Sequence, residues 1–92
     1  MSYQIEYHPE VKKDIVSLPR NVKERLRKAI EGRLMQDPLH YGDPLRKSLA
    51  GYRKLRVGDY RIIYRLVSQK IVVLKIGHRR EVYDRVEKRL SG

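Results

Sequence analysis

Residues 52–76 read YRKLRVGDYRIIYRLVSQKIVVLKI, and this stretch decides the fold. Its apolar and polar side chains alternate with a period of two, which is typical of β-strands with one buried face. Gly58-Asp59 and residues 68–70 interrupt the alternation. Glycine at the first position of a two-residue turn permits the positive φ that a tight hairpin needs. The stretch therefore predicts three consecutive antiparallel strands at 52–57, 60–67 and 71–76.

The residues before this stretch predict one strand and two helices. Residues 3–7 alternate in the manner of a first strand, and His8-Pro9 ends it because proline cannot donate to a ladder. Apolar residues then recur at helical spacing over 11–18 and again over 22–35, on either side of Pro19. We expect these helices to form a hairpin that packs on one face of the sheet.

Two further segments complete the predicted fold. Residues 37–51 contain two Asp-Pro pairs and two glycines, which indicates a long loop. Residues 80–90 carry apolar side chains at helical spacing and predict a final helix. The predicted order is β-α-α-β-β-β-α, a single small α+β domain over residues 1–92 with an antiparallel β-sheet.

The composition narrows the classes of function. The 92 residues contain 22 Lys and Arg against 11 Asp and Glu, which gives a formal net charge of +11 and a pI of about 10.2. Such an excess of cations points to a polyanionic partner, most often a nucleic acid. The 40% hydrophobic content excludes a disordered basic tail. The absence of cysteine excludes a disulfide framework, a thiolate zinc site and a cysteine nucleophile.

Membrane and metal classes are also disfavoured. No apolar run exceeds four residues, which excludes a transmembrane helix, and the N-terminal MSYQIEYH lacks the pattern of a signal peptide. We therefore expect a cytoplasmic protein without a membrane partner. Histidines and carboxylates show no metal-binding spacing, so we expect neither a metal nor another cofactor.

The face of the predicted sheet opposite the helices is basic. Period-two alternation assigns Val72, Leu74 and Ile76 to the core side of the last strand. Residues 52–92 hold 12 of the 22 basic residues but only 4 of the 11 acidic ones. A charged face can serve solubility alone, but such a face would mix signs, so we interpret this one as a polyanion-binding surface. The face, which we expect to be open to solvent, carries Tyr52, Lys54, Arg56, Arg61, Arg65 and Lys75.

Tyrosines among these cations favour RNA over duplex DNA. Cations neutralise phosphates, and a tyrosine ring can stack on an unpaired base. Tyr52 and Tyr83 are the candidates for stacking. The alternative for each is an ordinary tyrosine at the edge of a strand.

Residues 52–64 (YRKLRVGDYRIIY) and 77–83 (GHRREVY) resemble the RelE/ParE superfamily of toxins from bacterial and archaeal toxin–antitoxin pairs. The resemblance covers essentially the whole chain, because the predicted order of elements also matches the small fold of the family. RelE-type members are ribosome-dependent mRNA endonucleases, whereas ParE-type members inhibit DNA gyrase. The resemblance implies metal-independent cleavage of mRNA in the ribosomal A site. Gyrase inhibition, or a degenerate member that only binds its antitoxin or DNA, are the alternatives.

The resemblance also implies individual roles. Lys54 matches a family lysine proposed as general base, and Arg61 matches the arginine that stabilises transition-state charge. Arg79 matches an arginine assigned to the leaving group, and Tyr83 matches a tyrosine that stacks on or orients the substrate base. His78 is a further catalytic candidate because imidazole suits acid–base work. The alternative for His78 is that it only caps the last strand.

The remaining candidates bind RNA rather than catalyse. Arg56 matches a phosphate-contacting position of the family. Tyr52 falls where RelE-type enzymes with two strand lysines have the first of them, and the spacing from Arg79 to Tyr83 is shorter than in the best-studied type. The implied partners are a cognate RelB-like antitoxin, the ribosome with its mRNA, and operator DNA in a higher-order toxin–antitoxin complex. The predicted RNA-binding set is Tyr52, Arg53, Arg56, Arg65, Lys75 and Arg80.

Overall fold

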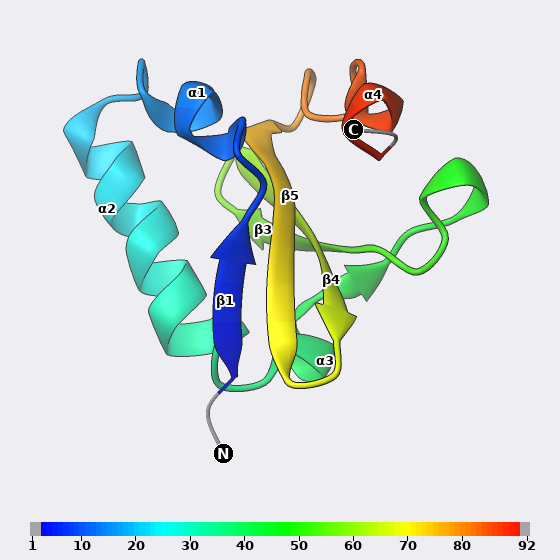
Figure 1. The fold of residues 1–92 in the computed structure, drawn as a ribbon. Coiled ribbons are helices and arrows are strands. Elements are labelled where there is room, and N and C mark those ends of the chain that lie inside the picture. Colours follow the sequence, from blue (N-terminus) through cyan, green and yellow to red (C-terminus); the bar gives the residue numbers. More distant parts are fainter. Residues whose placement is uncertain (1–2, 91–92) are drawn as a thin grey trace.

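The computed structural model describes residues 3–90 as a five-stranded sheet with the N-terminal helices on one face and the C-terminal segment on part of the other (Figure 1). The strand order across the sheet is β1-β5-β4-β3-β2. Strands β2 to β5 pair as antiparallel neighbours, whereas β1 runs parallel to β5, with Gln4 opposite Lys70. The strands are β1 (Gln4–Tyr7), β2 (Asp43–Pro44), β3 (Arg53–Val57), β4 (Tyr60–Val67) and β5 (Lys70–His78).

The predicted α+β class and the three-strand antiparallel core of the sheet are confirmed. The first strand differs from the prediction, because it lies parallel on the outer edge of β5 and makes the sheet mixed. Gly58 has φ of 60° in the turn between β3 and β4, as the hairpin prediction requires. No helix between residues 3 and 90 is long and apolar enough to cross a bilayer.

The helices are shorter and more broken than their apolar periodicity predicts. The predicted second helix continues past α2 as a single wide turn, η1, and the predicted loop at 37–51 contains three short elements. The predicted helix at 80–90 forms only in its last five residues, because Arg85 has φ of 56°, a value outside the α-helical region. The elements are α1 (Val11–Ile15), α2 (Arg20–Ala29), η1 (Ile30–Leu34), α3 (Pro38–Tyr41), η2 (Lys47–Leu49) and α4 (Val86–Leu90).

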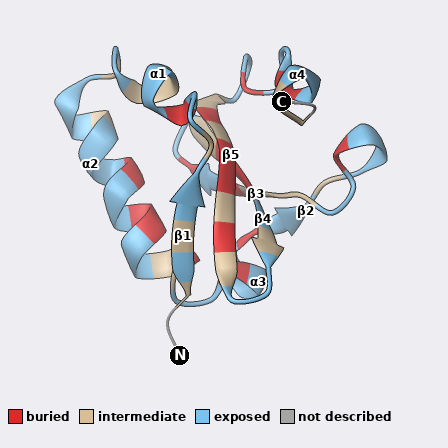
Figure 2. Cartoon of the chain, in the orientation of Figure 1, coloured by how far each residue is buried: buried red, intermediate tan, exposed pale blue. Residues whose placement is uncertain are grey.

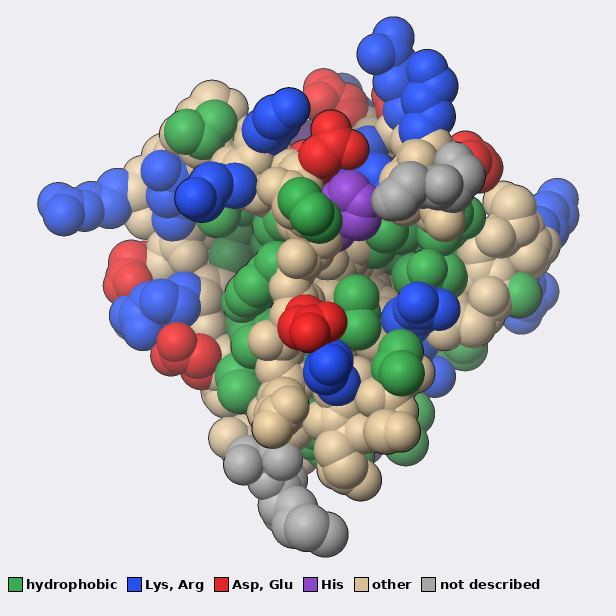
Figure 3. Space-filling view, viewed as in Figure 1, with side chains coloured by type: hydrophobic (Ala, Val, Ile, Leu, Met, Phe, Trp, Pro, Cys, Tyr) green, Lys and Arg blue, Asp and Glu red, His purple; other side chains and the backbone are tan. Residues whose placement is uncertain are grey.

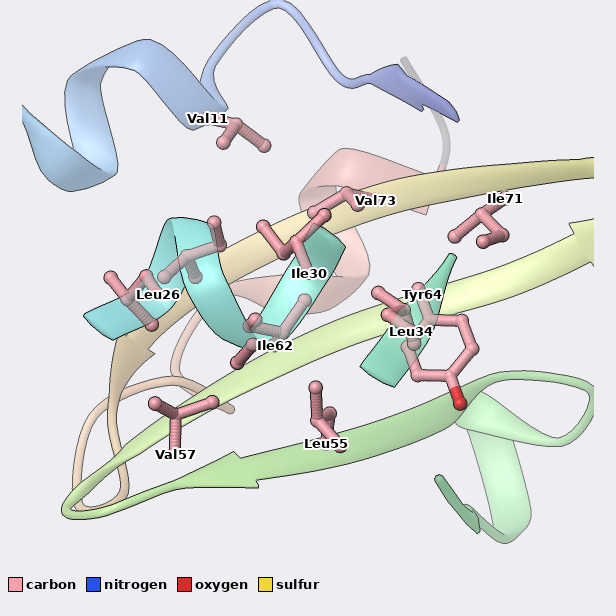
Figure 4. Packing of buried hydrophobic residues seen from close by; sticks show 12 residues of the cluster. Val11, Leu26, Ile30, Leu34, Leu55, Val57, Ile62, Tyr64, Ile71 and Val73 are labelled. Carbon is pink, nitrogen blue, oxygen red and sulfur yellow. The ribbon is translucent and has the colours of Figure 1, made fainter. Parts of the chain in front are cut away.

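The main core lies between the helices α1, α2 and η1 and the sheet. Figure 2 shows buried positions on the side of α2 that faces the strands and along β5. Leu26, Ile30 and Leu34 project from the helical layer toward Leu55 of β3 and Ile62 of β4 (Figure 4). Burying side chains of this size stabilises the fold by about 1.5 to 3 kcal/mol each.

A second apolar cluster covers part of the opposite face, so the expectation of an open face was wrong there. Ile63 and Leu74 of the sheet pack against Val82 and Val86 of the C-terminal segment and against Leu49. This packing holds residues 79–90 against the sheet. The basic surface is therefore confined to the part of this face that the cluster leaves uncovered.

A β-bulge explains why Leu74 joins this second cluster. Tyr64 pairs with Val73 and Ile63 pairs with Lys75, so Leu74 is one extra residue in β5. As a result, Ile71 and Val73 face the helices, where the alternation had placed Val72 and Leu74. Beyond the bulge the original phase returns, and Ile76 faces the helices as predicted.

A half-buried ion pair ties the C-terminal helix to the N-terminal one. Arg89 of α4 and Asp14 of α1 form two parallel bonds of 2.6 Å each (Nη1 to Oδ2 and Nη2 to Oδ1). Asp14 Oδ2 also accepts from Ile76 N at 3.0 Å, and Arg89 Nη1 donates to Leu74 O at 3.1 Å. Because β1 ends opposite Val73, these side chains satisfy main-chain groups of β5 that no neighbouring strand reaches.

Candidate nucleic-acid interface

The cations of β3 and β4 form rows across the two strands on the face away from the helices. Arg56 lies directly opposite Arg61, and Lys54 lies opposite Ile63 in the next row. Like charges placed opposite each other in a sheet destabilise the free protein. Their juxtaposition therefore favours a surface that binds an anion over one that serves only solubility.

Tyr52 and Arg65 lie beside these cations and contact each other. The guanidinium carbon of Arg65 lies 5.5 Å from the centre of the Tyr52 ring, a cation–π contact. Tyr52 is half-buried against the second apolar cluster, while Arg65 is exposed. The ring is thus held by packing on one side and by a cation on another.

The segment after β5 folds back over the sheet beside Gly77. Gly77 lies opposite Arg61 in the ladder, and a Cβ built on it would be in van der Waals contact with Val82, 3.4 Å from its Cα. Val82 is fully buried at this fold-back. The next residue, Tyr83, is 37% exposed on the outside of this fold-back.

Arg61 and Arg79 meet at the turn between β3 and β4. Arg61 Nη1 donates to Gly58 O at 2.9 Å and to Tyr60 O at 2.8 Å. Arg79 N donates to Asp59 O at 2.8 Å, and its Nε lies 3.9 Å from Asp59 Oδ1. Within residues 3–90, Arg61 Nε and Nη2 have no protein partner, so they can donate to a phosphate.

Three predicted site residues, Arg53, His78 and Lys75, do not contribute to the basic surface. Arg53 lies on the helix side, where its Nη2 donates to Gly42 O at 2.6 Å and to Leu39 O at 2.9 Å. His78 also lies on the helix side, with its ring 5.8 Å from the ring of Tyr60, and its Nδ1 accepts from Arg80 N at 3.2 Å.

Lys75 does face the second cluster, but its ammonium donates to the carbonyl of Asp84. It thereby anchors the C-terminal segment rather than extending the basic surface. Arg53 and His78 are separated by the sheet from Lys54 and Arg61, so we withdraw both from the candidate site. The fold brings Tyr52, Lys54, Arg56, Arg61 and Arg65 to one face of β3 and β4, with Arg79 at the turn between these strands, and Arg80 and Tyr83 are exposed in the segment that follows.

One neighbour of this site was not predicted from the sequence. Arg25 of α2 reaches the turn, because a Cβ built on Gly58 would lie 2.4 Å from Arg25 Nη2. Arg25 is one of several cations on the polar side of α2. No local pattern distinguishes it from them, since only the tertiary fold brings it to the hairpin.

A separate concave surface lies between α2 and β1. It is an apolar groove of about 700 Å³, and Figure 3 shows its green side chains along the left of the molecule. Its rim carries Lys12, Lys23 and Arg27, and one carboxylate, Glu31. The apolar residues that line it include Ile5, Tyr7, Val11, Leu26, Ile30 and Met35.

This chain is similar to known toxins in both sequence and fold. The family described as the ParE toxin of the type II toxin–antitoxin system parDE matches residues 5–83. The toxin RelG of Mycobacterium tuberculosis is 32% identical over 87 residues, which cover 92% of this chain and all of RelG. The mRNA interferase toxin RelE of Escherichia coli is 30% identical over 95 aligned positions, covering 98% of this chain and 99% of RelE.

A solved structure agrees with the sequence relatives. The RelBE2 toxin–antitoxin complex of Mycobacterium tuberculosis contains a chain that superposes with a TM-score of 0.80 at 30% identity. The superposition covers 85% of this chain and 99% of that one. The match over nearly the whole fold and the shared sequence lead to one assignment: the chain belongs to the RelE/ParE superfamily of type II toxin–antitoxin toxins.

Proposed function

We propose that this toxin is a ribosome-dependent, metal-independent mRNA endoribonuclease. The observation that carries the proposal is the meeting of Arg61 and Arg79 at one turn, with Lys54 in the adjacent row of the same sheet face. RNA cleavage by an internal nucleophile needs a base, cationic stabilisation of a phosphorane and an acid. Lys54 can act as the base, and Arg61 and Arg79 can stabilise the developing charge, so that water can serve as the acid.

The reaction follows from the chemistry of RNA. The ribose 2′-oxygen attacks the adjacent phosphorus, the bond from phosphorus to the 5′-oxygen breaks, and the products are a 2′,3′-cyclic phosphate and a 5′-hydroxyl. In this scheme Lys54 removes the proton from the 2′-hydroxyl, and Arg61 stabilises the phosphorane. Arg79 stabilises the charge on the departing 5′-oxygen, which takes a proton from water to become the 5′-hydroxyl, and Tyr83 stacks on the substrate base. The ribosome holds the message in place, and such positioning can supply a large part of the rate acceleration.

Cleavage in a translation extract tests the proposal. Primer extension on the message should reveal cuts when the toxin is added at catalytic concentration. Arg61→Ala should slow cleavage more than about tenfold, because it removes a preorganised donor to the phosphorane. Arg20→Ala, which removes an exposed cation of α2, is the matched control and should cleave at the wild-type rate. An intact message with the wild-type toxin would refute nuclease activity.

Gyrase inhibition is the second candidate, because the matching family carries the description of the ParE toxin. A supercoiling assay with purified gyrase distinguishes the two. Inhibited supercoiling together with intact mRNA would select this candidate. Growth that continues on expression without antitoxin would indicate a degenerate toxin with neither activity.

We also propose that the toxin binds a RelB-like antitoxin. The related chain in the RelBE2 structure was crystallised in a toxin–antitoxin complex. The apolar groove between α2 and β1, with Lys12 and Lys23 at its rim, suits an amphipathic segment with acidic side chains. Co-expression with the neighbouring reading frame, followed by co-purification, tests this partner. Failure of that product to bind or to relieve growth arrest would contradict the proposal.

A further inference from the structure

The turn between β3 and β4 is contacted by a cation from the helical layer. Arg25 of α2 packs against Gly58 so closely that a Cβ built on Gly58 would lie 2.4 Å from Nη2 and 3.3 Å from Cζ. Glycine therefore serves this turn in two ways. It adopts the φ of 60° that the turn needs, and its missing side chain leaves room for Arg25. The contact brings the guanidinium of Arg25 to the edge of the candidate interface.

Three arginines from distant parts of the chain thus converge on two residues. Arg25 comes from α2 and packs on Gly58, Arg61 comes from β4 and donates to Gly58 O, and Arg79 follows β5 and contacts Asp59. Asp59 supplies the one carboxylate of the turn itself. Gathering cations around a single carboxylate costs free energy in the free protein, and a bound polyanion would restore it.

The surroundings of Arg25 differ from those of its neighbour Arg27. Glu24 and Glu31 hold Arg27 in salt bridges of 2.8 and 3.1 Å. Arg25 is exposed, and it has no hydrogen bond or ion pair with any residue from 3 to 90. The helix thus neutralises one arginine with two carboxylates and leaves the arginine beside the turn with its charge uncompensated.

We propose that Arg25 is a further RNA-binding residue, which contacts a message phosphate next to the one held by Arg61 and Arg79. The RNA strand then passes over the β3–β4 turn, from the basic face toward α2. The proposal rests on the proposed function in taking RNA as the polyanion. RNA is favoured over an acidic protein because its phosphates recur at every nucleotide, so a strand bound at Arg61 presents another anion nearby.

Binding to an RNA that cannot be cleaved tests this role separately from catalysis. The probe is a short single-stranded 2′-O-methyl RNA labelled for fluorescence anisotropy, titrated at several sodium chloride concentrations. Arg25→Ala should weaken binding about tenfold at low salt, the scale of one charged hydrogen bond. It should also reduce the slope of log K against log salt by about 0.7, the value for one phosphate on a single strand.

Two further variants identify the cause of any change. Arg25→Lys keeps the charge and should retain the salt slope. Arg20→Ala removes the same charge from the same helix away from any described contact, so it should retain wild-type affinity. Equal affinities for Arg25→Ala and Arg20→Ala, or a wild-type toxin that binds no RNA, would overturn the proposal.

The binding experiment tests the role of Arg25 independently of nuclease activity. A toxin that leaves mRNA intact but loses RNA affinity on Arg25→Ala would refute the proposed function and support this inference. A toxin that cleaves mRNA and binds RNA equally well with and without Arg25 would support the proposed function and refute this inference.

Discussion

Position 42 leaves no room for any side chain, so only glycine fits there. Its position is buried, and a Cβ built there would lie 1.8 Å from the Tyr64 hydroxyl oxygen and 2.7 Å from Tyr64 Cζ. Gly42→Ala should therefore lower the free energy of unfolding by about 1 to 3 kcal/mol or more, the usual cost of overpacking. Urea denaturation measures the change. Gly32→Ala is the control, because nothing lies within 4 Å of its added Cβ, and alanine there should stabilise the helical turn by up to about 1 kcal/mol.

Tyr64 should make stability sensitive to high pH. Burial among the core side chains (Figure 4) raises the pKa of its hydroxyl above the ordinary value of 10.0, and the hydroxyl donates to Pro38 O at 2.5 Å. The folded state thus favours the protonated form. This contribution is complete below pH 10 and is lost as the pH rises through the folded pKa. The free energy of unfolding of the wild-type protein should fall above pH 10, and that of Tyr64→Phe should fall less steeply. Parallel curves for the two proteins would contradict this assignment.

The fate of single side chains was the least predictable part of the site. Arg53 was predicted to bind RNA, yet it alternates in phase with Leu55 and Val57 and donates to carbonyls 11 and 14 residues earlier. No local pattern announces such a contact. Lys54, Arg56 and Arg61 could be predicted to share a face because strand geometry alone sets the direction of their side chains.

At the scale of elements, the Arg89–Asp14 pair holds α4 against the sheet. The hydrogen bond with Asp14 raises the pKa of Arg89, so its guanidinium keeps its charge in this half-buried position. Asp14→Asn should destabilise the fold by about 3 kcal/mol, because it leaves the poorly hydrated charge of Arg89 with only the more distant Glu10, 3.9 Å from its Nε. Hydrogen exchange should also quicken at residues 86–90.

A second variant separates the charge from the packing. Asp14→Leu combined with Arg89→Met replaces the pair with apolar side chains and should recover much of the lost stability. A double variant that is no more stable than Asp14→Asn would indicate that the bonds to Leu74 O and Ile76 N, rather than the charges, hold α4.

The elements that were predicted correctly are those with an uninterrupted local pattern. β3, β4 and the hairpin between them follow from alternation and one glycine. The partner of β1 and the bulge at Leu74 do not, because both depend on pairing with a distant strand. Apolar spacing over 80–90 resembled a helix since Val82 and Val86 bury on one side, although a turn separates them.

For the whole molecule, the charge of +11 should make the fold itself sensitive to salt. Repulsion among the cations destabilises the compact state, and dissolved ions screen it. The Tm should rise between 20 and 300 mM sodium chloride at pH 7. Inorganic phosphate at equal ionic strength should raise it further, since it can bind the arginines around the β3–β4 turn. A Tm that falls with salt would show that ion pairs outweigh the repulsion.

The pairing of β1 with β5 has a consequence for the timing of synthesis. Gln4 is made 66 residues before its partner Lys70. At cellular rates of elongation this is a wait of roughly 3 to 13 s. The strand and the apolar residues beside it have no sheet to join during that interval. The complete five-stranded sheet, which carries the basic surface of β3 and β4, therefore forms only after β5 has been made.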